Sequence, residues 1–165
     1  MAKTLTDLYE IDHIYNIGLS FSPVSDNLFS RAIHKVIRGK YTHVDIWINN
    51  ALVTVDPLNK GVQAFIPDDY YKGRQAYIDL TPCVHKYNLD LAAGLNWLKA
   101  QKGKGYDWLN IIFCQFLPFN ADNKDRWICS ELAVAFLQKC RLPITDKPKH
   151  VNPRRLYDIV TDWFV

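Results

Sequence analysis

The chain has 165 residues, of which 48% are hydrophobic and 22% are charged, the composition of one compact domain with an ordinary core. Twenty Lys and Arg residues against seventeen Asp and Glu residues give a formal net charge of +3, and the basic residues are scattered. A phosphate-binding face needs a concentrated basic stripe, so nucleic acid is not expected as the main partner. We predict a single domain over residues 1–165.

Nothing in the sequence is typical of export or of membrane insertion. Residues 1–10 are polar and lack the apolar stretch of a signal peptide. The most apolar run, residues 108–119, contains Asn110, Gln115 and Pro118 and is too short to span a bilayer. We therefore expect a cytoplasmic protein with free thiols and no stable membrane insertion, or one released by lysis or carried in a virus particle. The oligomeric state is left open.

The first half of the chain predicts mainly antiparallel strands. A strand is expected over residues 15–21, and helical spacing from an N-cap at Ser25 predicts a helix that ends at Gly39. Residues 42–48 alternate between apolar and polar side chains, which predicts a strand with His43, Asp45 and Trp47 on one face. The remaining expected elements are a turn at 49–50, a return strand at 51–55 ended by 56–57, and strands at 61–66 and 76–80.

The second half of the chain predicts helices. Apolar spacing indicates helices over residues 88–101 and 106–116, the latter ended by Pro118. Residues 129–140 form the clearest helical pattern, and Pro153 opens a last helix over 154–163. An antiparallel sheet followed by helices predicts the α+β class.

Cys129 is the best candidate nucleophile among the four cysteines. It stands in the first turn of the predicted helix, where unpaired N–H groups and the helix dipole stabilise a thiolate. A small apolar residue at a helix start is the simpler interpretation of the same position. Cys83, Cys114 and Cys140 have no such context and are expected to be structural, and no C-x-x-C pair is present to bind zinc.

A cysteine nucleophile needs a base, and His43 is the best placed of the five histidines. It lies at the start of a predicted strand, which would fix the direction of its ring, whereas the others fall near the N-terminus, on a helix or in loops. A partly exposed strand histidine is the plainer alternative. No two histidines have the i, i+4 spacing of a zinc site, so no metal is expected.

Four motifs spread along the chain resemble one enzyme family. They are T-H-V-D-I at 42–46, Y-D-W at 106–108, W-I-C-S-E-L at 127–132 and N-P-R-R-L at 152–156. Together they resemble the circularly permuted branch of the NlpC-like papain-fold cysteine peptidases and amidases. This branch includes the YiiX-type proteins and is related to the lecithin:retinol acyltransferase-like enzymes. The resemblance implies a permuted papain-like fold with an antiparallel sheet packed against helices and the nucleophile at a helix N-terminus.

The resemblance also implies roles for individual residues. Cys129 becomes the nucleophile and His43 the general base. The family's third polar residue lies on the next strand, at the position of Thr54, where Glu, His, Asn or Gln is more usual. Asp56, two residues further on, is the alternative orienting residue. Tyr106 matches a position near the active site, in the oxyanion hole or against substrate, or else it packs between helices.

One further residue departs from the family pattern. The glycine that follows H-V in the family is replaced by Asp45. Since Asp45 shares a strand face with His43, it could border the cleft and attract a cationic substrate group, but a solvent-facing residue is the preferred interpretation.

These residues favour a cysteine hydrolase that cleaves a peptide or other amide, such as a peptidoglycan peptide, without a cofactor. The alternatives are a lipid acyltransferase or thioesterase of the same superfamily, and a non-catalytic binding or structural protein that retains the fold.

Overall fold

A computed structural model describes residues 4–23, 31, 40–56, 61–67, 76–106 and 126–164. Six strands form one antiparallel sheet in the order β1-β5-β4-β3-β2-β6. The bounds of these strands are β1 Thr4–Thr6, β2 Ile17–Pro23, β3 Tyr41–Ile48, β4 Ala51–Asp56, β5 Gly61–Ile66 and β6 Ala76–Asp79. Two short parallel strands, β7 (Gly105–Tyr106) and β8 (Arg126–Trp127), form a separate pair.

The central hairpin joins β3 to β4 through the predicted turn. Ile46 pairs with Val53 and Ile48 with Ala51, so the two strands are connected by Asn49 and Asn50 alone. Asn49 has a φ of 56°, a left-handed conformation that asparagine adopts more readily than most residues. The Asn-Asn pair therefore sets the register that brings Thr54 of β4 near the start of β3.

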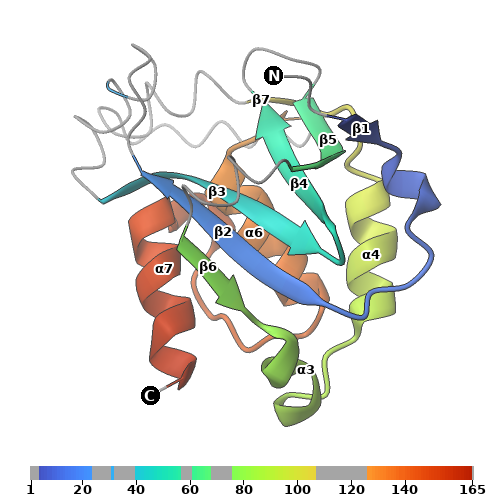
Figure 1. Cartoon of the computed structure of the whole chain (residues 1–165). Helices are drawn as coiled ribbons and strands as arrows, with labels where there is room; N and C mark the ends of the chain where they lie inside the picture. The colour runs from blue at the N-terminus through green and yellow to red at the C-terminus, as the bar shows by residue number, and fades with distance from the viewer. Residues whose placement is uncertain are drawn as a thin grey trace.

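Four α-helices lie within the described residues, and three of them pack beside or behind the sheet (Figure 1). Figure 1 shows α6 behind the sheet, with α4 on one side of it and α7 on the other. The short α3 follows β6 directly. Their bounds are α3 Thr81–Lys86, α4 Leu91–Lys99, α6 Cys129–Lys139 and α7 Pro153–Thr161. Single 3-10 turns lie at Leu8–Glu10, Pro148–His150 and Asp162–Phe164.

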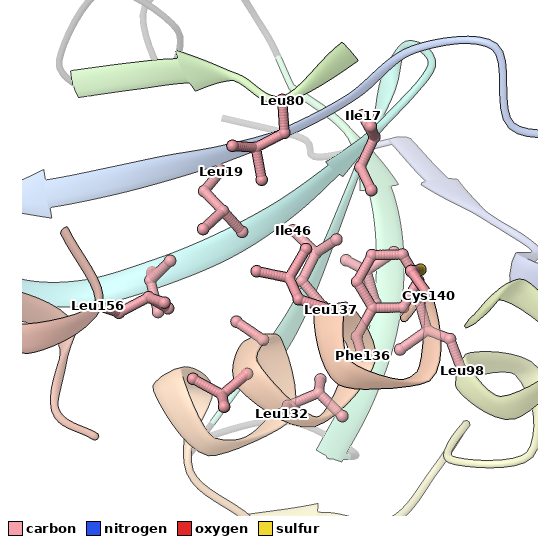
Figure 2. Close-up of a cluster of buried hydrophobic side chains, with 14 of the residues drawn as sticks. Ile17, Leu19, Ile46, Leu80, Leu98, Leu132, Phe136, Leu137, Cys140 and Leu156 are labelled. Carbon is pink, nitrogen blue, oxygen red and sulfur yellow. The ribbon is translucent and has the colours of Figure 1, made fainter. Parts of the chain in front are cut away.

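The core lies between the sheet and α6. In Figure 2, Leu19 of β2 and Ile46 of β3 point toward α6, which carries Leu132 and Leu137, and all four are buried. Successive side chains of β3 point to opposite faces of the sheet. The apolar ones therefore hold α6 against the sheet, while the polar ones are left for other contacts. This packing fixes the start of α6 relative to β3.

The α+β prediction is confirmed, and most predicted elements are present. The predicted helix at 88–101 begins later, at Leu91, because Asn88 has a φ of 50° and Asp90 caps the helix. Tyr106, predicted to open a helix, lies instead in β7, and residues 107–116 of that prediction lie outside the described residues. The predicted helix after Ser25 also lies outside them, apart from Arg31. The elements β1, α3, β7 and β8 were not predicted.

No helix in the described part of the chain is both long and apolar enough to cross a membrane.

Candidate active site

Cys129 is the first residue of α6, as the sequence predicts. The preceding Ile128 is the N-cap, and its side chain makes no capping hydrogen bond. An apolar N-cap leaves N–H groups of the first turn without a side-chain acceptor, so their partial positive charge is available at the thiol. The residue is buried, with 4% of its surface exposed. The helix therefore presents a nearly enclosed thiol at its electropositive end.

His43 lies on β3, and its ring is held through one nitrogen. Nε2 lies 2.7 Å from Oδ1 of Asp45 and 3.1 Å from Oγ1 of Thr54. An ionised carboxylate only accepts hydrogen bonds, so Nε2 carries a hydrogen and donates it. About a quarter of the His43 side chain (27%) is exposed, whereas the Asp45 side chain is fully buried. This arrangement leaves Nδ1 as the ring nitrogen available to a further partner.

Cys129 lies close enough to His43 to act on its ring. Its charge and its hydrogen-bonding capacity both raise the pKa of the imidazole. The structure thus brings together the nucleophile and the base that the sequence predicts, from a helix start and a strand far apart in the chain. Proton transfer between two side chains requires that they come within hydrogen-bond distance in the reacting state.

The charge on His43 is set by opposing effects. Burial of the ring lowers its pKa, but the carboxylate of Asp45 and the thiolate form of Cys129 raise it, and the net result is a pKa well above the ordinary value. Asp45 and Cys129 therefore both favour the imidazolium form of His43. An imidazolium beside a cysteine is the arrangement that stabilises a thiolate.

The orienting residues only partly match the prediction. Thr54 is buried and contacts His43, as the resemblance implies. Asp56 is the last residue of β4 and Tyr106 belongs to β7, but their side chains lie outside the described residues. The preferred interpretation of Asp45 as a solvent-facing residue is wrong, because its side chain is fully buried against His43. The shared strand face of Asp45 and His43 was the signal that could have found this pair.

The other described cysteines lie in apolar surroundings. Cys83 and Cys140 are free and buried. Burial raises the pKa of both thiols, to about 12 for Cys140. Both residues fit the predicted structural role, and Cys114 lies outside the described residues.

Within the described residues, no group of three or more His, Cys, Asp or Glu side chains could hold a metal ion. Comparison of the chain with protein-family models, with curated proteins and with solved structures gives no match.

Proposed function

We propose that this protein is a cysteine hydrolase that cleaves an amide bond through an acyl-enzyme, with Cys129 as nucleophile and His43 as general base. One observation carries the proposal: the thiol at the start of α6 acts on an imidazole ring whose Nε2 is held by Asp45 and Thr54. A nucleophile, a base and an orienting group gathered in one cluster are the signature of an activated nucleophile.

In the first half of the reaction, the thiol proton passes to His43 and the sulfur attacks the carbonyl carbon of the substrate. The oxyanion is stabilised by N–H groups of the first turn of α6, which no N-cap side chain occupies. The imidazolium of His43 then returns its proton to the leaving amine as the C–N bond breaks, and a thioester on Cys129 remains.

In the second half, His43 takes a proton from water, and the resulting hydroxide attacks the thioester carbonyl. The C–S bond breaks, the carboxylic acid product leaves, and the proton on His43 returns to the sulfur. The cycle needs no cofactor. Ester and thioester substrates would follow the same steps with an alcohol or thiol as leaving group.

The order of elements agrees with a permuted papain-like fold, which we include in the proposal. The base lies on a strand that precedes the nucleophile helix in the chain, and the orienting Thr54 lies on the strand that follows the base. The nucleophile helix packs against the sheet that carries the base, as Figure 1 shows. Each of these features is what the family resemblance implies.

The proposal is tested by the rate of iodoacetamide labelling at Cys129 between pH 5 and 10, read by mass spectrometry. We expect labelling below pH 8 to be faster than that of a free thiol, whose ordinary pKa is about 8.5, and the advantage to vanish in His43→Ala. Cys83 and Cys140 serve as internal controls, since both are buried with raised pKa values. Ordinary reactivity, unchanged by the substitution, would rule out an activated nucleophile.

A second experiment separates amide cleavage from acyl transfer. The protein is incubated with peptidoglycan stem peptides, other peptide amides and acyl thioesters, and the mass of an acyl adduct on Cys129 is sought. Adducts from amides, followed by release of the free acid, support the hydrolase. Adducts from thioesters alone, released to an added alcohol or amine, would support the acyltransferase alternative.

A further inference from the structure

The site contains a buried carboxylate that the resemblance does not assign. Asp45 follows His43 by two residues on β3, so both side chains leave the same face of the strand. Its side chain is fully buried and its Oδ1 lies 2.7 Å from Nε2 of His43. Buried carboxylates are costly unless paired. The tight pairing with His43 provides such compensation.

Thr54 also contacts Nε2 of His43, but at a longer distance and through a neutral hydroxyl group. Its Oγ1 lies 3.1 Å from Nε2 of His43, which is longer than the contact with Asp45. A hydrogen bond to an ionised acceptor is roughly twice as strong as one between neutral groups. A single N–H that faces both acceptors therefore binds mainly to the carboxylate.

We propose that Asp45, rather than Thr54, is the principal positioning residue of the site. Its carboxylate holds the His43 ring by Nε2 and stabilises the imidazolium that forms when the ring takes the thiol proton. The proposal rests on the hydrolase function proposed above. It assigns the orienting negative charge to Asp45 instead of to the positions that the resemblance implies. It agrees with the effects on the His43 ring, since among the described residues only Asp45 and Cys129 act on it by charge.

The test compares Asp45→Asn with Thr54→Val in the iodoacetamide assay. Asparagine keeps the size and an acceptor oxygen but removes the charge, and valine removes only the hydroxyl. We expect Asp45→Asn to slow Cys129 labelling at pH 6.5 by about tenfold or more and to move the pH profile toward that of a free thiol. Thr54→Val should cause a loss several times smaller. The exposed Asp12→Asn, with the same change of net charge, is the matched control.

A second measurement does not depend on the folding of Asp45→Asn. In Cys129→Ser, which leaves Asp45 as the charged neighbour of the ring, we expect NMR titration to place the His43 pKa above the ordinary value of about 6.5. A value at or below it would overturn the proposal, as would a larger loss of labelling in Thr54→Val than in Asp45→Asn. If Cys129 of the wild type is labelled faster than a free thiol, and His43→Ala removes this difference but Asp45→Asn does not, the role of Asp45 alone is overturned. If Cys129 of the wild type is labelled no faster than a free thiol, and His43→Ala leaves the rate unchanged, the proposed hydrolase function is overturned as well.

Discussion

His43 and Asp45 form an ion pair between two residues of one strand, with Nε2 and Oδ1 2.7 Å apart. The His43 side chain is partly exposed, whereas the carboxylate of Asp45 is fully buried. A pair of this kind combines a partly accessible imidazole with a charge that water does not screen. The same pair makes the stability of the protein depend on pH.

The first prediction concerns this pH dependence. The folded pKa of His43 lies above its unfolded value of about 6.5, so the pair stabilises the fold fully below pH 6.5 and less as pH rises through the folded pKa. We expect Asp45→Asn to lower the free energy of unfolding most at pH 6 and progressively less toward pH 9. The gain at low pH is about 1.4 kcal/mol for each unit by which the pKa is raised.

The measurement is urea unfolding of Cys129→Ser with and without Asp45→Asn, so that the thiol does not titrate. The exposed Asp12→Asn again controls for net charge. A difference between the two proteins that grows with pH would contradict the ion pair.

The second prediction concerns the contact between α4 and α6. A Cβ atom on Gly94 of α4 would clash with Sγ of Cys140, at the C-cap of α6, and lie 3.2 Å from Cε2 of Phe136. We therefore expect Gly94→Ala to destabilise the protein by about 1–3 kcal/mol in urea unfolding, although alanine is the better helix former. Combined with Cys140→Ala, which removes the sulfur, the same substitution should cost less than it does alone. Equal costs in both backgrounds would show that the clash is relieved elsewhere.

The third prediction concerns the joint between β5 and the segment after α4. Gly61 has a φ of 79°, and a Cβ there would clash with the carbonyl of Lys104. That carbonyl accepts a 2.9 Å hydrogen bond from Val62 N–H. Gly103 has nearly the same φ, 78°, but a Cβ there would meet nothing within 4 Å.

Both Gly61→Ala and Gly103→Ala carry the cost of a left-handed residue, about 1–2 kcal/mol, but only Gly61→Ala adds a backbone clash. We expect thermal unfolding to show the larger loss for Gly61→Ala, by at least about 1 kcal/mol. Equal losses of stability for the two variants would mean that the backbone around Lys104 moves at little cost to accommodate the new Cβ atom of Gly61→Ala.

The fourth prediction concerns Asn49 in the central hairpin. Its Oδ1 accepts hydrogen bonds from the N–H groups of Tyr15 and Asn16, and its Nδ2 donates to the carbonyl of His13. Asn49→Gly keeps the left-handed backbone but loses these bonds, and Asn49→Ala loses both. We expect a loss of about 1–2 kcal/mol for glycine and a larger one for alanine, measured by urea unfolding. If Asn49→Ala were more stable than Asn49→Gly, the left-handed backbone conformation at position 49 would carry no free-energy cost for alanine.

Local sequence patterns were sufficient for the elements that carry the site. The alternation at 42–48, the Asn-Asn turn and the helical spacing at 129–140 each reflect a local preference, so β3, β4 and α6 were predicted from the residues themselves. The short pair β7 and β8 was missed because its strands are two residues long and are defined only by each other. Tyr106 lies in that pair because a non-local partner, Trp127, overrides its local helical pattern.

The sequence by itself determined that His43 lies on a strand and that Cys129 starts a helix, because both depend on residues a few positions away. Only the tertiary structure decided that they meet, since the packing of α6 on the sheet depends on apolar contacts from many segments. It also decided the role of Asp45. Strand alternation placed this carboxylate beside His43, but burial, which makes its charge effective, depends on the folded chain around it.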